Sequence, residues 1–467
     1  MKSFLDFQTE ENMSMFTDLY ELTMCASYFD NKKFNPATFD LFIRRLPPGR
    51  PYFLFAGLEQ VLRFLEKMKF TEEHLAYLRK QGFEEAFLEY LRNFKFTGEV
   101  WAVPEGSVVF PNEPLIQVTA PIIEAQVVET FLLNTINLQT MIATKASRVV
   151  HAAQGKPVIE FGLRREHGID AGIKVARCSY IAGCAGTSNV LAGMAYGIPV
   201  FGTMAHSFVM SFEKEIDAFR AFAKTFPNNS TLLIDTYDDI TGAEKAAQVA
   251  KELERKGCKL GGVRLDSGDL AETSKKVRAL LDKKGLQQVS IFASGDLDEY
   301  KIADLLSKGA RINAFGVGTK MGTSADYPYT DVIYKLSETM NDEGGFSPIM
   351  KLSKGKVTLP GRKQVFRFKD KKGNYRKDTI ALAEEEVDAE PLLMKVMDHG
   401  KTCIALPSLN DIRNAALQNL ANLPEKYKKL TEASTYPVTL SRPLEDLIKN
   451  LKEKLIKNEV SSNSHTR

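Results

Sequence analysis

The sequence predicts an α/β protein in which a (β/α) barrel lies between an N-terminal α+β domain and a small C-terminal β-rich appendage. Short apolar runs alternate with helical patterns through the middle of the chain. Before residue 150, helical periodicity mixes with short β-like runs, and after about residue 341 the alternation stops and Gly, Lys and Asp become frequent. We therefore expect domains at residues 1–150, 151–340 and 341–467, with a disordered tail from Ser461.

Length and composition exclude several classes of protein. A chain of 467 residues with 44% hydrophobic residues can bury a large core, which excludes extensive disorder. Its 62 Lys and Arg residues nearly balance its 59 Asp and Glu residues, whereas nucleic-acid binders concentrate positive charge. We therefore expect no nucleic-acid partner, and we interpret the basic stretch Lys354–Lys377 as a solvated β-rich surface.

Cysteine spacing and apolar runs indicate the compartment. The five cysteines are widely spaced and form no CxxC pair, so we expect neither a disulfide framework nor a structural zinc site. Acidic residues interrupt the start of the chain, where a signal peptide needs an apolar segment, and no run of about 18 apolar residues occurs. We expect a cytoplasmic protein with no membrane contact.

The first third of the chain carries mixed signals. Leu58, Val61 and Leu65 recur at helical spacing, while Val100–Val103 and Val108–Phe110 are short β-like runs bounded by Pro and Gly. A long apolar helical pattern follows over residues 122–150. This combination is typical of an α+β segment that ends in a long helix.

Seven short apolar runs predict the parallel strands of the central domain. They are Val158–Gly162, Pro199–Gly202, Leu232–Asp235, Gly262–Asp266, Val289–Ala293, Ile312–Val317 and Val332–Leu336. Among the intervening helices, Thr241 and Glu244 match a capping box, and Asp296 is the predicted cap of a helix that Gly309 ends. Six or seven such strands in sequence favour a barrel over an open sheet.

Polar side chains follow nearly every predicted strand. The carboxyl ends of barrel strands open on one face, so these side chains should gather there. They are Glu160, Arg164 and Arg165; Thr203 and His206; Asp235, Asp238 and Asp239; Arg264, Asp266 and Asp269; Ser294 and Asp296; and Gly316, Gly318, Thr319 and Lys320.

Two glycine-containing turns follow the late strands. Ala293–Asp296 and Gly316–Lys320 can each expose backbone N–H groups to a phosphate, and their glycines allow close approach. Either turn alone is equally well an ordinary connection between a strand and a helix. Because the two follow neighbouring strands, they resemble a barrel phosphate site, and both interpretations stay open.

The charged and titratable candidates have two readings each. Arg164, Arg165 and Arg264 present planar forks that match a carboxylate or phosphate and indicate an anionic substrate, although surface salt bridges would explain each one alone. His206 lies between a strand and an apolar helix, which suits a catalyst or a packing residue. Asp235 can bind ribose hydroxyls, or Mg²⁺ through water. No HxH or HxxxH spacing predicts a set of metal ligands.

Several motifs occur in order between about residue 15 and residue 322. They are Thr17-Asp18-Leu19-Tyr20 with Thr23-Met24, Phe42-Ile43-Arg44-Arg45, Glu160-Phe161-Gly162-Leu163-Arg164-Arg165, Ser188-Asn189 through Gly193, Gly202-Thr203-Met204-Ala205-His206-Ser207-Phe208, Val263-Arg264-Leu265-Asp266-Ser267-Gly268-Asp269 and Gly316-Val317-Gly318-Thr319. As a set they resemble the nicotinate phosphoribosyltransferase family.

The resemblance implies a type II phosphoribosyltransferase fold with an irregular α/β barrel. It implies a homodimer in which helices of the N-terminal domain help each subunit complete the active site of the other. The implied reaction joins nicotinate to 5-phosphoribosyl 1-diphosphate, giving nicotinate mononucleotide and diphosphate, with ATP as co-substrate and Mg²⁺ as cofactor. This is the first step of NAD salvage from nicotinate. Only Cys403 lies in the C-terminal region, so we expect no zinc there.

The resemblance also assigns roles to residues. His206 would be transiently phosphorylated by ATP, Asp266 would face the ribose, and Arg264 would act with them as a catalytic residue. Tyr20 would stack on the pyridine ring and Thr319 would lie near the sugar phosphate. The full set of implied substrate-binding residues is Tyr20, Phe161, Arg164, Arg165, Thr203, Asp235, Ser294, Gly295, Gly316, Gly318 and Thr319.

Four alternatives stay open. A nicotinamide phosphoribosyltransferase would share the barrel and the histidine, and the arginines favour the carboxylate of nicotinate. A quinolinate phosphoribosyltransferase fits less well because it lacks the ATP-linked histidine. A phosphosugar aldolase would need a Schiff-base lysine at a strand end, for which Lys320 is the candidate. A nucleotide sensor without activity is opposed by the polar residues at so many strand ends.

Overall fold

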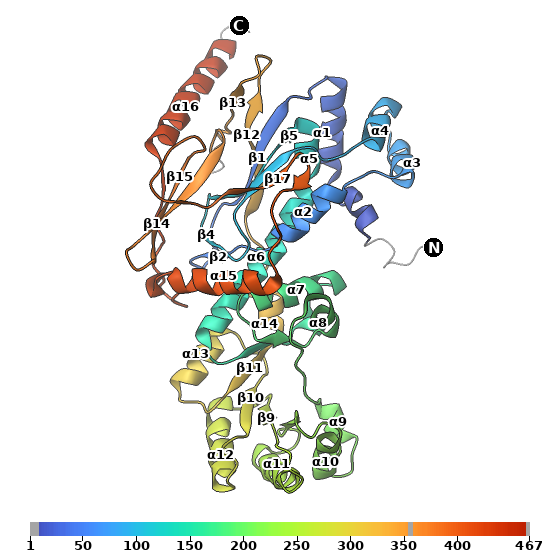
Figure 1. Ribbon diagram of the computed structural model, residues 1–467, viewed down its shortest axis with the longest axis vertical. Coiled ribbons are helices and arrows are strands. Elements are labelled where there is room, and N and C mark those ends of the chain that lie inside the picture. The colour runs from blue at the N-terminus through green and yellow to red at the C-terminus, as the bar shows by residue number, and fades with distance from the viewer. Residues whose placement is uncertain (1–8, 354–357, 464–467) are drawn as a thin grey trace. The chain divides into compact units, whose positions relative to one another are not determined.

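The computed structural model describes residues 9–353 and 358–463, which form two compact units. One unit contains the described residues of Met1–Thr140 and Tyr329–Arg467, and the other contains Met141–Pro328. Figure 1 shows the course of the chain through each of them. The domain limits at residues 150 and 340 stay a prediction. No helix in residues 9–353 and 358–463 is both long enough and apolar enough to cross a membrane.

The first unit is built around a seven-stranded antiparallel sheet. Its strands run in the order β13-β12-β1-β5-β3-β17-β18. Their bounds are β1 Pro36–Ile43, β3 Glu99–Ala102, β5 Pro114–Pro121, β12 Val332–Met340, β13 Phe346–Pro348, β17 Met394–Asp398 and β18 Lys401–Thr402. The inner strand β1 is buried over nearly its whole length. Segments from both ends of the chain therefore share one sheet, because β12 and β17 pair with β1 and β3.

The prediction of a parallel barrel strand at Val332–Leu336 is wrong. This segment is the first part of β12, which pairs antiparallel with β1 in the first unit. Val332, Tyr334 and Leu336 all pack on the core of that unit. Tyr334 and Leu336 alternate with the polar residues Lys335 and Ser337, which suits an antiparallel strand with one face on a core, whereas strands of a parallel sheet are buried on both faces.

Helices and smaller sheets complete the first unit. The helices are η2 Glu10–Met15, α1 Leu19–Asp30, α2 Leu58–Lys67, α3 Glu72–Lys80, α4 Glu85–Arg92, α5 Ile122–Val127, α6 Glu129–Ala152, which continues into the second unit, α15 Leu409–Asn422, η4 Glu425–Tyr427 and α16 Arg442–Asn463. The remaining strands are β2 Phe53–Leu54, β4 Val108–Val109, β14 Lys363–Lys369, β15 Tyr375–Leu382, β16 Glu390–Pro391 and β19 Val438–Leu440. Residues 464–467 of the predicted tail and 354–357 of the basic stretch lie outside the described residues.

The second unit contains a six-stranded parallel sheet in the order β7-β6-β11-β10-β9-β8. The strands are β6 Val158–Glu160, β7 Gly186–Thr187, β8 Thr231–Leu233, β9 Gly262–Leu265, β10 Ser290–Ala293 and β11 Ala314–Val317. The helices are η3 Leu163–Arg165, α7 Ile169–Ile181, α8 Val190–Tyr196, α9 His206–Met210, α10 Glu215–Thr225, α11 Asp239–Glu254, α12 Leu270–Lys283, α13 Glu299–Ser307 and α14 Thr319–Gly322. Figure 1 shows β9, β10 and β11 side by side among these helices.

The parallel sheet is confirmed, but the closed barrel is not. Within the described residues no hydrogen-bonded pairing joins β7 to β8, so the sheet is open. The predicted strand Pro199–Gly202 forms a single parallel bridge, from Val200 to Thr187. Apolar runs identify strands locally, whereas closure depends on pairing between segments far apart in the chain.

A buried ion-pair cluster anchors the start of α13. Glu299 is fully buried, and its carboxylate lies 2.6 Å from Lys145 Nζ and 3.3 Å from Arg148 Nε. Lys145 Nζ also lies 2.8 Å from Asp326. Because α13 directly follows the turn that begins at Ser294, this cluster fixes the helix on which the turn depends.

Glu299→Ala should destabilise the protein by about 3–5 kcal/mol, because removing one partner of a buried ion pair leaves charge without compensation. Here two buried cations, Lys145 and Arg148, would lose a carboxylate. Urea unfolding at neutral pH measures the loss. Glu254→Ala is the control, since Glu254 pairs with Lys251 at the surface and exposed pairs contribute about 1 kcal/mol or less. Equal losses for the two variants would contradict the anchoring role.

Candidate active site

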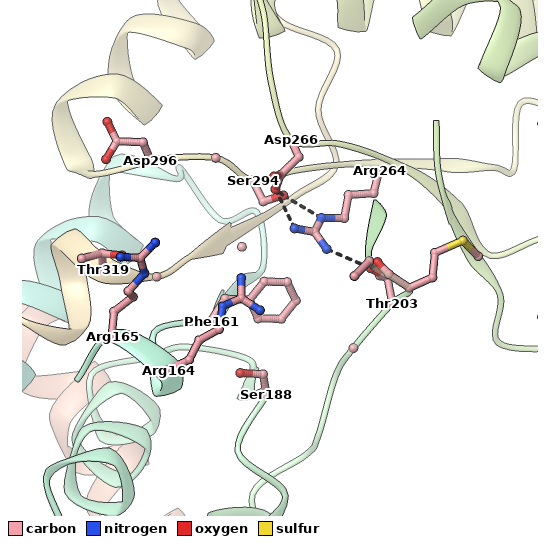
Figure 2. Close-up of a pocket in the computed structure, with 16 residues that line it drawn as sticks. Phe161, Arg164, Arg165, Ser188, Thr203, Arg264, Asp266, Ser294, Asp296 and Thr319 are labelled. Atoms are coloured by element: carbon pink, nitrogen blue, oxygen red, sulfur yellow. Dashed lines mark hydrogen bonds and ion pairs between the residues drawn. The ribbon is translucent and has the colours of Figure 1, made fainter. Parts of the chain in front are cut away.

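A cavity of about 370 Å³ opens at the carboxyl ends of the parallel strands. It is lined by Phe161, Arg164, Arg165, Ser188, Gly202, Thr203, Met204, Ala205, Arg264, Asp266, Ser294, Gly295, Asp296, Gly316, Gly318 and Thr319. Most of these residues follow β6, β7, β9, β10 and β11 or stand at their ends, and residues 202–205 follow the isolated bridge at Val200. The structure thus brings together most of the residues predicted from the sequence, and Figure 2 shows how they face the cavity.

Arg264, on β9, is held by three side chains at once. Its Nε donates to Ser294 Oγ at 2.7 Å, and one terminal nitrogen donates to Thr203 Oγ1 at 3.0 Å. The other donates to Asp266 Oδ1 at 2.6 Å. The guanidinium also lies 5.7 Å from the centre of the Phe161 ring. Because three directions are fixed, the guanidinium is oriented before any substrate arrives.

Asp266 is kept ionised by the same cluster. Burial opposes its ionisation, but the Ser294 hydroxyl, which donates to Oδ1 at 2.5 Å, and the Arg264 guanidinium outweigh burial and lower the pKa of the carboxyl. Asp235 also holds the backbone at Asp266 in place, because its Oδ2 accepts from the Asp266 N–H at 2.8 Å and from the Ser267 hydroxyl at 2.7 Å. A fixed negative charge therefore lies at the cavity wall.

Both glycine turns have backbones that approach their neighbours closely. Gly295 has φ of +98°, and a Cβ there would collide with the Asp266 carbonyl. Gly316 lies flat against two rings, with a Cβ position 2.8 Å from Phe161 and from Phe292. Only glycine fits either position, so backbone N–H groups can face the cavity without side chains in the way.

Lys320 joins the two turns. Its Nζ lies 3.2 Å from Asp296 and 3.2 Å from Asp298. Burial opposes its charge, but these two carboxylates outweigh burial and raise the pKa of the amine. A protonated amine in two ion pairs is a poor Schiff-base nucleophile, which argues against the aldolase alternative.

His206 is the first residue of α9, beside the cavity. Its Nδ1 lies 3.2 Å from Thr236 Oγ1, and its Nε2 lies 3.9 Å from Asp266 Oδ2. The imidazole is 40% exposed, so its nitrogens can be reached from solvent. The ring is thus contacted by Thr236, the residue that follows Asp235 in the chain. Thr236 lies between the acidic candidates Asp235 and Asp238 and gave no signal of its own.

Some of the polar residues at strand ends serve the fold. Asp238 caps α11 by accepting from the Thr241 N–H at 2.8 Å, and Asp269 caps α12. Asp239 accepts from the Thr273 hydroxyl at 3.2 Å. Tyr20 belongs to the first unit, at the start of α1, where its side chain is 47% exposed. Burial and the neighbouring Glu129 raise its pKa, so the phenol stays neutral.

Metal-binding capacity is limited. Residues 9–353 and 358–463 contain no group of three or more His, Cys, Asp or Glu side chains arranged to hold a metal ion. Asp266 and Asp296, the carboxylates of the cavity wall, are already paired with Arg264 and with Lys301 and Lys320. A divalent cation would therefore have to bring most of its oxygen ligands with it.

The fold and the cavity together define a class of protein. Arginines, a fixed carboxylate and glycine turns at the carboxyl edge of a parallel sheet suit an enzyme that binds a phosphate-bearing, anionic substrate. Three family models match the chain: the nicotinate phosphoribosyltransferase N-terminal domain at residues 15–137, the family itself at 157–363 and its C-terminal domain at 386–448. The chain belongs to the nicotinate phosphoribosyltransferase family.

Individual relatives agree with this assignment. The chain is 49% identical to nicotinate phosphoribosyltransferase pncB2 of Mycobacterium tuberculosis, over 92% of this chain and 91% of that one. It is 39% identical to nicotinate phosphoribosyltransferase of Bacillus subtilis, over 92% and 94% of the two chains. The crystal structure of human nicotinic acid phosphoribosyltransferase matches with a TM-score of 0.83 at 31% identity, over 93% of this chain and 99% of that one.

Proposed function

We propose that this protein transfers the phosphoribosyl group of 5-phosphoribosyl 1-diphosphate to nicotinate, forming nicotinate mononucleotide and diphosphate in NAD salvage. The observation that carries the proposal is the cluster of Arg264, Asp266, Ser294 and Thr203 in a cavity bounded by the two glycine turns. Family membership limits the substrate class, and the arginines favour a pyridine that carries a carboxylate over a neutral amide.

The reaction breaks the bond between the anomeric carbon and the diphosphate oxygen and forms a bond from that carbon to the pyridine nitrogen. Positive charge develops on the ribose as diphosphate leaves, and the ionised Asp266 would stabilise that charge. The pyridine nitrogen is already a nucleophile, so no general base is needed. Arg164 and Arg165 would bind the anionic groups, and the turns at Gly295 and Gly318 would hold phosphate through backbone N–H groups.

ATP would act through His206. The imidazole nitrogen attacks the γ-phosphorus, ADP leaves, and water later cleaves the phosphohistidine to free phosphate. The contact between Nδ1 and Thr236 supports this role, since a hydroxyl that accepts from Nδ1–H leaves the lone pair on Nε2 for attack. Exposure of the ring supports it as well, because the γ-phosphate must reach the nitrogen.

Mg²⁺ fits as a companion of the phosphates. The cation would neutralise the diphosphate leaving group while keeping phosphate oxygens and water as ligands, which Mg²⁺ accepts readily. Asp266 and Asp296 are the carboxylates of the cavity wall that could contact its bound water.

A homodimer with shared sites is supported by exposed apolar side chains beside the cavity residues Ser188 and Gly202. They are Val190, Leu191, Met194, Val200 and Phe201, and each is at least 44% exposed. Apolar groups that gather on a surface mark an interface. The exposed ring of Tyr20 would stack on the pyridine bound by the partner subunit. The cytoplasmic location stays a prediction from the sequence.

Product formation from nicotinate and, separately, from nicotinamide tests the function, each with phosphoribosyl diphosphate and Mg²⁺, with and without ATP. We expect nicotinate mononucleotide, formed faster when ATP is present. Product from nicotinamide alone would overturn the substrate assignment and keep the reaction type. Borohydride trapping at Lys320 with a phosphosugar carbonyl would favour the aldolase instead.

A further inference from the structure

Two carboxyl groups face each other beneath the cavity wall. Glu160, at the end of β6, is fully buried; its Oε1 accepts from the Gly162 N–H and its Oε2 accepts from the Thr187 hydroxyl at 2.6 Å. Glu166 follows η3. Both of its carboxyl oxygens are buried, and neither accepts a hydrogen bond of the kind that a buried carboxylate requires. A Cβ added to Gly162 would lie 2.6 Å from Glu166 Oε1 and 3.0 Å from Glu160 Oε1, so the two carboxyl groups meet beside this glycine.

Three glycines make room for the Glu166 carboxyl. A Cβ on Gly162 would lie 2.6 Å from its Oε1, one on Gly322 would lie 2.7 Å from Oε1, and one on Gly172 would lie 3.1 Å from Oε2. These glycines belong to the start of η3, to α14 and to α7. The carboxyl is therefore enclosed by backbone from three elements, with little room for water.

These elements carry other charged groups. On η3 they are Arg164 and Arg165, which line the cavity; on α7 they are Asp170, Lys174 and Arg177, of which Lys174 pairs with Asp170 at 2.7 Å; and on α14 it is Lys320, paired with Asp296 and Asp298. Glu160 is the charged group whose field acts on Glu166.

A buried pair of carboxyl groups without a cation cannot ionise twice. Burial is the larger cause and the field of Glu160 the second, and together they raise the pKa of Glu166 to about 9. The Glu166 carboxyl is therefore protonated at neutral pH, and its O–H can donate to Glu160.

We propose that Glu160 and Glu166 share one proton and act as positioning residues for η3, so that Arg164 and Arg165 face the cavity. Gly162 is the N-cap and Glu166 the C-cap of η3. Glu160 holds the N-cap by accepting from the Gly162 N–H, and it holds the C-cap through the proton that it shares with Glu166. It also holds Thr187, the neighbour of Ser188 in the cavity wall. Loss of the proton sets two buried carboxylates against each other and releases the end of η3 next to Arg165.

Glu166→Gln tests the positioning role, because the amide N–H₂ can donate to Glu160 at every pH. This arm rests on the proposed phosphoribosyl transfer. The KM of the wild-type enzyme for phosphoribosyl diphosphate should rise about tenfold between pH 8 and pH 10, and that of the variant should stay nearly constant. Glu244→Gln, an exposed change of the same kind on α11, is the control and should follow the wild type. Identical profiles for the wild type and Glu166→Gln would overturn the positioning role.

Urea unfolding tests the shared proton without any assay of activity. The pKa of Glu166 in the fold lies above its ordinary value of 4.5, so its stabilising contribution is fully present below pH 4.5 and is lost as pH rises to about 9. Between these values the unfolding constant of the wild type, divided by that of Glu166→Gln, should rise by up to about tenfold per pH unit. A ratio that does not change with pH would overturn the inference.

The two arms separate the possible failures. If the ratio of the unfolding constants depends on pH but no phosphoribosyl transfer is detected, the inference of a shared proton stands and the proposed function is overturned. Should Glu166→Gln fail to fold, infrared spectra of the wild type and of Glu113→Gln decide, because Glu113 is another buried acid whose pKa is raised. In both we expect the C=O stretching band of a protonated carboxylic acid at pH 7 and a weaker band at pH 10. A band that does not weaken between pH 7 and pH 10 would overturn the shared proton.

Discussion

His206→Ala should abolish the stimulation of mononucleotide synthesis by ATP and leave a weak synthesis that does not depend on ATP. The variant loses the nitrogen that would accept the γ-phosphoryl group but keeps Arg264, Asp266 and both glycine turns. We expect the ATP-supported rate to fall by at least about 100-fold, the order found when a group that acts on reacting atoms is removed. Initial rates of product formation with and without ATP measure the effect.

Phosphorylation of His206 can be followed directly. Label transferred from the γ-phosphate of ATP should be acid-labile, present in the wild type and absent from His206→Ala. Thr236→Val should lower the amount of label, because the ring loses the contact that fixes its tautomer. His167→Ala is the control, since His167 is exposed and lies outside the cavity lining. ATP stimulation that survives in His206→Ala would exclude the phosphohistidine.

Much of this site could be predicted because strand ends are local features. The runs before Glu160, Arg264, Ser294 and Gly316 are short and apolar, and each is followed at once by a polar or glycine residue. A parallel sheet places such positions at one edge. The cavity therefore contains the predicted residues even though the sheet is open.

Capping and pairing were harder to predict. The sequence favoured Thr241 and Asp296 as helix caps, but Asp238 caps α11 and Asp298 caps α13, each by accepting an N–H at 2.8 Å. Several nearby residues satisfy the same local rule, and packing of the first turn decides among them. The place of β12 in the other unit could not be predicted, because its partner β1 lies far away in the sequence.

Two side-chain contacts gave no signal in the sequence. The contact of Thr236 with His206 spans 30 positions, and the meeting of Glu166 with Glu160 depends on three glycines from different elements. From sequence alone, a glutamate in a loop is normally interpreted as a solvated charge. Only the enclosing backbone makes this one a buried acid.

Arg264→Lys should lower kcat/KM for phosphoribosyl diphosphate by roughly 10²–10³-fold, the order found for loss of one preorganised donor at a site where charge develops. Lysine keeps the positive charge but cannot donate to Ser294, Thr203 and Asp266 in the fixed directions of the guanidinium. Arg311→Lys, an exposed change of the same kind, should leave the rate unchanged.

The pH profile separates a role in catalysis from a role in folding. Burial opposes ionisation of Asp266, and the Arg264 guanidinium, after the Ser294 hydroxyl, lowers its pKa. Removing both the charge and the bonds in Arg264→Ala should therefore raise the pKa of Asp266 and move the acid limb of the kcat/KM profile to higher pH. The lysine variant should show a smaller shift, because it keeps the charge. An acid limb that stays in place while the urea midpoint falls would mean that Arg264 supports the fold and does not tune the carboxylate that faces the reacting ribose.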